Sequence, residues 1–295
     1  MFDGIKRILQ DPPPVMAFEI SEAGVAAARI GARAEVAFHP LHPGVLDVSP
    51  LKENIADPDE LFMAVRDLAG AQGSRKRRDV ALILPDFATR IAVLDFDEFP
   101  SDPKEQLSLV RFRLKRSVPF DVESAAVSYW PQAHAGKKCD TIVVVAPLEI
   151  VSRYEAPFRA AGLNPGFVTV SAIAALELAT DGDLSVLVKV AGRALSVVVR
   201  QNSVVKLVRC LEVPSAAWED IAAVLLPTLV FIEDNLGARA DRLILCGFGT
   251  QTDEAQRRFQ SELGVAVEPL RSAWGMPAEH NAGLLGYLRS LSQNN

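Results

Sequence analysis

The amino-acid sequence predicts an α/β protein with mixed sheets. Short apolar stretches rich in valine and isoleucine indicate buried strands, and amphipathic patterns with clear start signals indicate helices between them. Both kinds of segment occur along the whole 295-residue chain, which favours an α/β architecture over a helical bundle or a β-sandwich. The expected strands lie at residues 80–84, 142–146, 186–190, 195–199 and 243–246.

A strand, a turn and a second strand are expected near residues 15–38, and a similar pattern returns near residues 184–210. Each of these patterns is followed, further along the chain, by a long helix. A duplicated lobe would leave such a pattern in the sequence. The length agrees, because 295 residues suffice for about two domains or for one large duplicated domain.

Two expected helices share the same start signal. The segments Asp57-Pro58-Asp59-Glu60 and Asp102-Pro103-Lys104-Glu105 each supply an aspartate N-cap, a proline at the first helical position and a glutamate in the first turn. The first helix is expected to end near Gly70 or Gly73. The second helix carries an apolar stripe formed by Leu107, Val110 and Leu114.

A third helix is expected over residues 214–237, with a bend at Pro227 because proline lacks a backbone N–H donor. After it, a strand leads through Gly247-Phe248-Gly249 into a helix that ends at Gly264. Backbone amides at such a helix start can face a phosphate, and glycine permits close approach of a ligand. A tight turn needs glycine as well, so this motif alone leaves ligand binding open.

Composition and charge exclude several classes of protein. A chain with 49% hydrophobic and 23% charged residues is neither disordered nor a disulfide scaffold. The net charge of −6 argues against sequence-independent binding of nucleic acid. The three cysteines are far apart in sequence, as is typical of a reducing compartment. Residues 1–14 hold neither a long apolar run nor a cleavage signal, so we expect the chain to stay in the cytoplasm.

Several clusters of charged or ligand-type residues have simple structural explanations. His39 and His42 lie in a proline-rich segment that indicates a surface turn, and no metal site is expected. The acidic residues at 95–98 indicate a solvated strand end. The basic run at 75–78 indicates a hydrated loop, with phosphate or anionic lipid as the alternative. Apolar residues on one side of segment 2–9 fit a membrane surface, a partner or the domain itself.

Three stretches follow one another in a recognisable order. The first consists of ALILPDFATRIAVLDFDEFP and, after a helix, VPFDVESAAVSYW. The second is TIVVVAPLEIVSRYEAPFRAAGLNPGFVTVSAIAALEL, and the third is RLILCGFGTQTDEAQRRFQSELGVAVEPL. Over about residues 15–270, they resemble the inserted module, its return to the first lobe, and the adenosine-side strand and glycine turn of PilM, the actin-like cytoplasmic protein of type IV pilus assembly.

The resemblance implies an actin-like fold with two duplicated lobes of ribonuclease H type, the first of which carries an inserted α/β module. Hardly any chain separates the strand near Arg209 from the helix near Pro214, so the upper subdomain of lobe II is expected to be reduced or missing. The expected parts are lobe I at 1–78, completed by 171–182 and 275–295, the inserted module at 79–170 and lobe II at 183–274.

The nucleotide cleft that the resemblance implies departs from the family pattern. The first hairpin should present an aspartate but has Glu19, and the second should present another aspartate but has Lys189. A lysine cannot ligate magnesium or help to activate water, and Glu22 would repel a triphosphate. The degenerate cleft is expected to comprise Glu19, Ser21, Glu22, Lys189, Gly192, Gly247, Gly249 and Thr250.

By resemblance, the chain is a non-catalytic scaffold, a pseudo-ATPase of the inner-membrane platform of a type IV pilus or type II secretion system. Its expected partners are the cytoplasmic tail of a PilN-like inner-membrane protein and other platform proteins. Recruitment would place it in the cytoplasm, peripheral at the inner membrane. No cofactor and no catalytic residue are expected. The alternatives are an actin-like ATPase or sugar kinase that binds ATP and magnesium, and an FtsA-like membrane-associated polymer.

The tail of the partner is expected in a groove between lobe I and the inserted module, beside the basic helix at 104–116. An extended apolar peptide could add main-chain hydrogen bonds and fill pockets there. The expected contact residues are Arg111, Lys115, Val118, Pro119 and Phe120.

Overall fold

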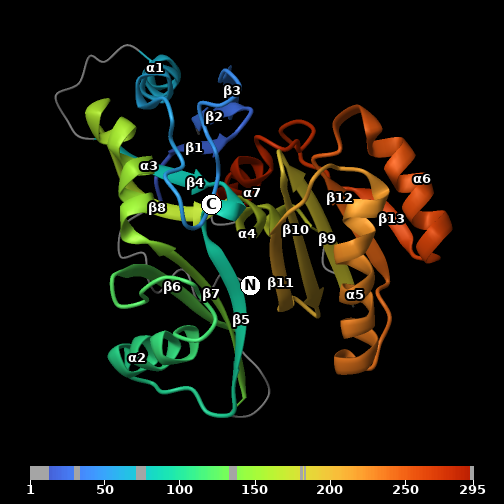
Figure 1. The fold of residues 1–295 in the computed structure, drawn as a ribbon. Coiled ribbons are helices and arrows are strands. Elements are labelled where there is room, and N and C mark those ends of the chain that lie inside the picture. The colour runs from blue at the N-terminus through green and yellow to red at the C-terminus, as the bar shows by residue number, and fades with distance from the viewer. Residues whose placement is uncertain are drawn as a thin grey trace.

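The computed structural model describes residues 13–29, 34–70, 78–132, 138–179, 182 and 184–292. The amphipathic segment at 2–9 and residues 75–77 of the basic run lie outside this part of the chain. Within it, the strands form two five-stranded sheets and one three-stranded sheet (Figure 1). The mixture of helices and mixed sheets confirms the α/β class that the sequence predicts.

The first sheet has the strand order β3-β2-β1-β4-β8. Strands β3, β2 and β1 are antiparallel to one another in turn, whereas β4 runs parallel to both β1 and β8. The three parallel strands therefore end at the same edge of the sheet. The strands are β1 (Met16–Ser21), β2 (Gly24–Arg29), β3 (Glu35–Pro40), β4 (Arg78–Leu84) and β8 (Leu163–Val170).

The second sheet repeats this topology with the order β11-β10-β9-β12-β13. Again the first three strands are antiparallel, and β12 runs parallel to both β9 and β13. The identical order and directions confirm the expected duplication. The strands are β9 (Leu184–Ala191), β10 (Ala194–Gln201), β11 (Val204–Glu212), β12 (Arg242–Cys246) and β13 (Ala266–Pro269).

The third sheet, with the order β5-β7-β6, lies beyond β4 and β8 and is antiparallel throughout (Figure 1). We call it, together with helix α2, the module. Strands β4 and β8 fall inside the range 79–170 expected for the inserted part, yet both are hydrogen-bonded into the first sheet. The part of the chain that forms the separate sheet therefore spans fewer residues than the range 79–170. Its strands are β5 (Arg90–Phe96), β6 (Ala125–Gln132) and β7 (Cys139–Pro147).

Helices α1 (Pro58–Ala69) and α2 (Pro103–Leu114) begin as the capping signals predict. The side chains of Asp57 and Asp102 each accept hydrogen bonds from two backbone N–H groups of the following first turn. Gly70 ends α1 with a positive φ of 73°.

Helix α5 (Trp218–Leu236) starts four residues later than Pro214 suggested, and it ends at Gly237 as expected. The hydroxyl of Ser215 accepts the N–H of Ala217, and this local turn delays the helix. Strand β11 ends at Glu212, so only a short loop precedes α5. This loop leaves no room for an upper subdomain of lobe II, which confirms that prediction. Helix α6 (Thr252–Leu263) follows β12 and ends at Gly264.

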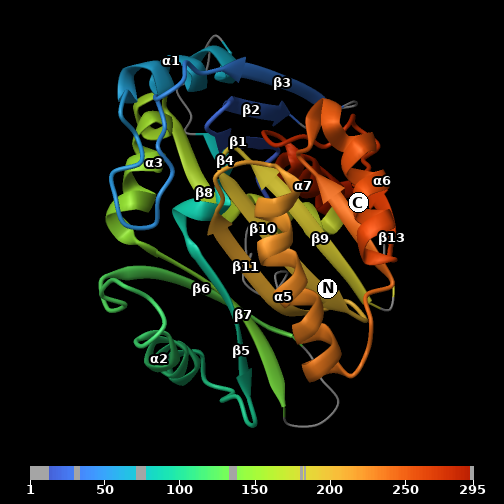
Figure 2. The same cartoon turned by 45° about the vertical axis from the view of Figure 1, so that its right-hand side comes forward.

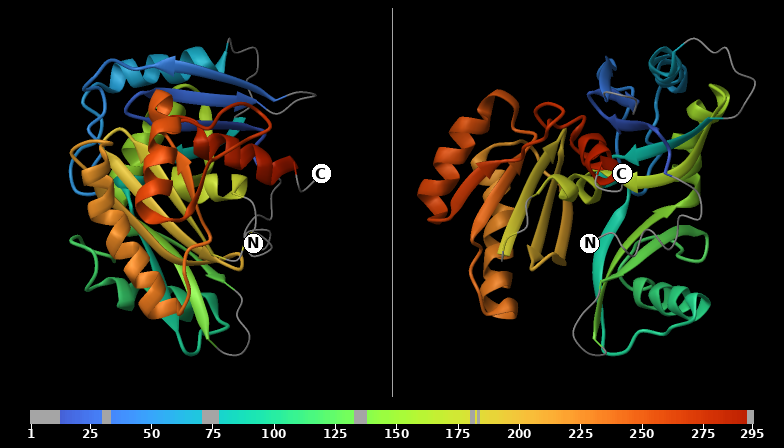
Figure 3. Two further views of the ribbon diagram at one scale, coloured as in Figure 1. Left: turned by 90° about the vertical axis from the view of Figure 1, so that its right-hand side faces the viewer. Right: turned by 180° about the vertical axis from the view of Figure 1, so that it is seen from behind.

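The helices form layers around the two large sheets. Helices α1 and α3 (Leu148–Ala160) cover the outer side of the first sheet, and α5 and α6 cover the outer side of the second (Figures 1 and 2). Helices α4 (Ser171–Ala175) and α7 (Ala282–Ser292) pack against each other between the sheets, as the view from behind also shows (Figure 3). No helix in the described ranges is long and apolar enough to span a membrane.

Candidate functional site

The candidate site lies where the edges of the two large sheets face each other. Strands β1, β4 and β8 end there, and β9 and β12 end opposite them. A cavity between them has a volume of only about 20 Å³, roughly the space that one buried water requires. The ionisable side chains that line it are Glu19, Glu22, Asp86, Lys189, Arg193, Glu212 and Glu279.

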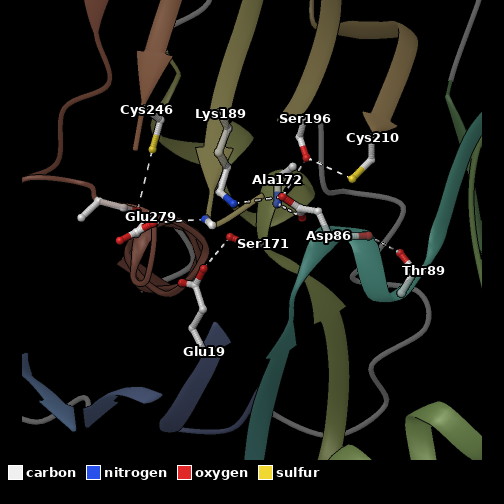
Figure 4. A network of polar contacts seen from close by, with 12 residues as sticks. Glu19, Asp86, Thr89, Ser171, Ala172, Lys189, Ser196, Cys210, Cys246 and Glu279 are labelled. Atoms are coloured by element: carbon white, nitrogen blue, oxygen red, sulfur yellow. Dashed lines mark hydrogen bonds and ion pairs between the residues drawn. The ribbon is translucent and has the colours of Figure 1, made fainter. Parts of the chain in front are cut away.

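A buried ion pair joins the two lobes in this cleft. The Nζ atom of Lys189, on β9, lies 2.9 Å from Oδ2 of Asp86, which directly follows β4 and Pro85 (Figure 4). The two side chains are 1% and 2% exposed. Burial disfavours the ammonium form of Lys189, but the carboxylates of Asp86 and Glu19 outweigh it and hold its pKa above the ordinary value. Lys189 therefore remains a buried cation.

Asp86 is held by donors from both lobes in addition to Lys189. The backbone N–H of Ala172, in the first turn of α4, donates to Oδ1 at 2.6 Å. The hydroxyl of Ser196, on β10, donates to Oδ2 at 3.0 Å. Both carboxylate oxygens of Asp86 thus accept hydrogen bonds from the protein itself, and Oδ2 has two donors.

Glu19, on β1, is also buried and fully engaged. Its carboxylate accepts a hydrogen bond from the hydroxyl of Ser171, and Oε2 accepts the backbone N–H of Leu284 in the first turn of α7 at 2.6 Å. Burial raises the pKa of Glu19 to about 7, against the opposing effects of Lys189 and of these two donors. Near neutral pH this carboxyl is therefore divided between its charged and neutral forms.

The turns of the two hairpins are in contact with each other. A Cβ atom on Gly192, in the second turn, would collide with the carboxylate of Glu22 in the first turn. The backbone N–H of Gly192 donates to Oε2 of Glu279 at 3.1 Å. The protein's own carboxylates thus occupy the positions next to this turn where an anionic ligand would bind backbone amides.

Ser21 lines the cavity together with this cluster, as expected, but the three expected cleft residues that follow β12 do not. Gly249 and Thr250 are exposed, and neither they nor Gly247 line the cleft cavity. A Cβ atom on Gly247 would collide with the carbonyl oxygen of Val190, so this glycine is required for close packing of the chain against β9. The neighbouring Phe248 lines a separate cavity of about 140 Å³ between α5 and α6.

The expected partner-binding residues lie at the end of α2 and in the turn before β6, at the end of the module that is nearest to α3. Arg111 donates to the backbone carbonyls of Val122 and Ala125, so it holds the turn that follows α2. Lys115 is exposed, with Nζ 3.9 Å from Oε1 of Glu123.

Val118 and Phe120 are half-buried against the core of the module, whereas Pro119 between them is exposed. Leu148, which sequence reasoning did not single out, begins α3 and is 56% exposed. It follows Pro147, the partner of Ala125 across β6 and β7, so it lies near the same turn. An exposed leucine beside this turn enlarges the apolar surface there.

The ionisable cleft residues that the sequence analysis missed are Asp86, Arg193, Glu212 and Glu279. Asp86 carried one usable signal, because a lone aspartate directly after a buried strand is placed at the carboxyl edge of a parallel sheet, where ligands and charged groups gather. Glu279 carried none, since it lies in an irregular segment before α7. In the described ranges, no three His, Cys, Asp or Glu side chains are arranged to hold a metal ion.

Two sheets of identical order, with a cleft between their carboxyl edges and α4 and α7 packed between them, define an actin-like fold. Among solved structures, the chain is similar to a chain of a PilM-PilN type IV pilus biogenesis complex, with a TM-score of 0.70 and 20% identity. The match covers 94% of this chain and 98% of that one. The expected PilM-like fold is thereby confirmed.

Two further solved structures have the same fold. A Bacteroides thetaiotaomicron protein with an actin-like ATPase fold and unknown function matches over 99% of both chains, with a TM-score of 0.59 and 13% identity. The cytoplasmic domain of EpsL, an inner-membrane component of the Vibrio cholerae type II secretion system, matches over 94% of both chains, with a TM-score of 0.51 and 13% identity. No family model and no curated protein matches the chain.

Magnesium and a nucleoside triphosphate, which an actin-like ATPase fold implies, do not fit the groups in this cleft. A magnesium ion needs oxygen ligands, but the buried ammonium of Lys189 lies at Asp86 and would repel a cation there, and the carboxylates of Glu19 and Asp86 already accept hydrogen bonds from the protein. A triphosphate would meet Glu22 and Glu279 at the turn of the second hairpin.

Proposed function

We propose that this protein is a non-catalytic, actin-like scaffold of the inner-membrane platform of a type IV pilus or type II secretion system. In this proposal it binds the cytoplasmic tail of a PilN-like membrane protein and needs no cofactor. It is located in the cytoplasm and reaches the inner membrane through that partner.

The observation that carries the proposal is the closed cleft. A lysine that forms a buried ion pair with Asp86 stands where a nucleotide-hydrolysing cleft needs a metal-binding carboxylate. The protein keeps the shape of the fold, and the ion pair at the centre of the cleft supports a role without nucleotide hydrolysis. Similarity to a chain of the PilM-PilN complex and to the EpsL cytoplasmic domain supports a platform role, because these are parts of pilus and secretion machines.

The tail-binding surface in this proposal includes the turn at Val118 to Phe120 and the neighbouring Leu148. The turn is apolar, and exposed Leu148 adds to it. Lys115 and Arg116 provide positive charge at its edge. An extended apolar peptide with an acidic or polar flank would match this surface.

A peptide titration tests the proposed partner. A labelled synthetic peptide with the sequence of a PilN-like cytoplasmic tail from the same organism is titrated with wild-type protein and with the variants Phe120→Glu and Leu148→Glu. We expect each variant to weaken binding at least about tenfold, which corresponds to about 1.4 kcal/mol. Val230→Glu is the matched control, because Val230 on α5 is 55% exposed and lies in the other lobe.

Circular dichroism accompanies the titration, because Phe120 packs against the module core and its replacement could loosen the fold. Leu148 is far more exposed, so its variant reports on binding with little effect on folding. Wild-type affinity in the folded Leu148→Glu variant would place the tail elsewhere. Failure of the wild-type protein to bind the tail would remove the partner proposal itself.

The non-catalytic role is tested separately with ATP and magnesium. We expect no saturable binding by calorimetry and no phosphate release above the rate of a buffer blank. Micromolar affinity with turnover that disappears in a Glu19→Gln variant would establish an actin-like ATPase instead.

A further inference from the structure

Strand β3 is an edge strand of the first sheet. It differs from β11, its counterpart in the second lobe, because among the described residues no other strand covers its outer edge. Strands β3 and β11 occupy the same outer position in the two duplicated sheets. Strand β11 packs against β5 of the module. The side chain of Gln132, on β6, accepts a hydrogen bond from the N–H of Val205, on β11, at 2.7 Å and donates one to its carbonyl at 2.9 Å. In the described part of the chain, no strand or side chain bonds the outer edge of β3 in this way.

The outward-facing backbone groups of β3 can be assigned from its register with β2. The N–H of Leu41 donates to the carbonyl of Ala23 at 3.1 Å, and the register pairs Pro40 with Gly24. Because hydrogen-bonded pairs alternate in an antiparallel ladder, the odd-numbered residues of β3 bond β2. Val36 and Phe38 therefore point their N–H and carbonyl groups away from the sheet.

Glu35 and Pro40 give the strand part of the protection that exposed edges normally carry, and the ring of Phe38 packs on that of His280 with 4.1 Å between centroids. Val36 is 37% exposed and Phe38 is 39% exposed, and the strand contains no lysine. An exposed edge with apolar residues and unpaired backbone groups is a template for another strand. Pro40, whose nitrogen has no hydrogen to donate, stands at the end of the strand and limits the template to the residues before it.

The sequence of β3 is complementary to itself in one antiparallel register. When Ala37 faces Ala37 of a second copy, Val36 lies opposite Phe38 and Glu35 lies opposite His39. The Val36 and Phe38 pairs are the ones whose backbone groups point outward, so they exchange hydrogen bonds in this register. Val36 then faces the ring of Phe38, which is a favourable cross-strand pair. The carboxylate of Glu35 faces the imidazole of His39, whose Nδ1 lies 3.8 Å from Oδ2 of Asp67 in its own chain.

We propose that β3 is a dimerisation edge, on which β3 of a second copy of this chain pairs antiparallel about a two-fold axis at Ala37. The two first sheets then form one continuous ten-stranded sheet. Such an interface is isologous, because the same residues serve on both sides. A single strand pair buries less surface than a standard stable interface, so the dimer is expected to be concentration-dependent.

Disulfide trapping tests both the edge and its register. In the proposed register, Ala37 faces its own copy in a pair without backbone hydrogen bonds, at about 4.5 Å between Cα atoms, which a disulfide can bridge. We expect Ala37→Cys to form covalent dimers under mild oxidation, and wild-type protein, with Cys139, Cys210 and Cys246, to form none. Glu35→Cys and His39→Cys are expected to cross-link when mixed, but not separately.

A sedimentation series tests the unmodified protein. We expect wild-type protein to shift from monomer to dimer with concentration, and Val36→Lys to remain monomeric with an unchanged melting temperature, since a lysine on an edge opposes pairing. The proposal is wrong if the wild-type protein stays monomeric at its highest soluble concentration, or if Val36→Lys still dimerises. Equal cross-linking of Glu35→Cys alone and in the mixture would exclude this register.

Discussion

The hairpins β1–β2 and β9–β10 have the same geometry and carry opposite charges at equivalent positions. Glu19 lies two residues before the end of β1, and Lys189 lies two residues before the end of β9. Both side chains are about 1% exposed and reach into the same cleft (Figure 4). Their surroundings differ, because Lys189 has a carboxylate partner, whereas Glu19 is held by a hydroxyl and a backbone N–H.

This difference shows two ways of burying a charge in one fold. Lys189 keeps its charge because Asp86 compensates it. The pKa of Glu19 rises to about 7, so this group can instead take up a proton. The duplicated backbone sets where the two side chains meet, and the partners set which form each one adopts. The first hairpin should therefore respond to pH, and the second to removal of its partner.

The largest expected effect comes from removing the cation of the second hairpin. Lys189→Met leaves Asp86 buried without its counter-charge, which is expected to lower the free energy of unfolding by about 3–5 kcal/mol. Chemical denaturation at neutral pH measures this loss. Adding Asp86→Asn removes the uncompensated charge, so the double variant is expected to be more stable than Lys189→Met alone.

The matched control for Lys189 is Lys206, whose Nζ lies 2.7 Å from Asp140 Oδ2 in a pair that is about one-fifth exposed. Lys206→Met is expected to cost only about 1 kcal/mol, since solvent screens the charge that remains. Equal losses in Lys189→Met and Lys206→Met would show that burial of the pair in the cleft has no special effect. If the double variant is no more stable than Lys189→Met, the charges of Asp86 and Lys189 are not energetically coupled.

The second expected effect concerns the residue after the central parallel strand of each lobe, which is Pro85 after β4 and Gly247 after β12. Gly247 has a φ of 84°, and a Cβ atom there would collide with the backbone of β9. Gly247→Ala is expected to lower the free energy of unfolding by about 2–4 kcal/mol, through backbone strain together with overpacking. Thermal and denaturant unfolding measure the loss.

Gly249→Ala separates these two causes, because Gly249 also has a positive φ, of 54°, but a Cβ atom added to it would meet no other atom within 4 Å. It is expected to cost about 1 kcal/mol from strain alone. A loss in Gly247→Ala no greater than this would contradict the packing explanation. Such a result would mean that Gly247 is required only for the backbone conformation of its turn.

Sequence reasoning succeeded where the determining signals are local. The aspartate caps of α1 and α2 act on N–H groups two and three residues away, so the chain itself contains the whole motif. The duplication was visible because each hairpin is a local pattern. The start of α5 was misplaced because the Ser215 hydroxyl forms a competing local turn, and a helix-start rule based on proline does not include it.

The candidate site depended on contacts that no local pattern reports. Lys189 meets Asp86 across 103 residues of sequence, and Gly192 meets Glu279 across 87. The changed charges at Glu19 and Lys189 could be recognised only through the resemblance to a family. In this cleft, the protein's own side chains take the places of the ligands that the family pattern implies. This follows from packing in three dimensions, which places Asp86 after β4 and Glu279 before α7.

The smallest expected effect is the pH response of the first hairpin. The pKa of Glu19 is raised from 4.5 to about 7 in the folded protein, so the folded state binds more protons than the unfolded state between these values. The stability that protonated Glu19 contributes is therefore fully present below about pH 4.5 and is lost as the pH rises through 7. At about 1.4 kcal/mol per pH unit, the loss amounts to at most about 3 kcal/mol.

Glu19→Gln isolates this contribution, because a neutral amide cannot ionise. We compare the unfolding free energy of the wild-type protein with that of Glu19→Gln at each pH. The stability of the wild-type protein relative to the variant is expected to fall between pH 5 and 8. Ser171→Ala removes a donor that lowers the pKa of Glu19, so it should move the midpoint of the fall to higher pH. A flat difference for Glu19→Gln would mean that Lys189 keeps Glu19 ionised, and the cleft would then hold three fixed charges.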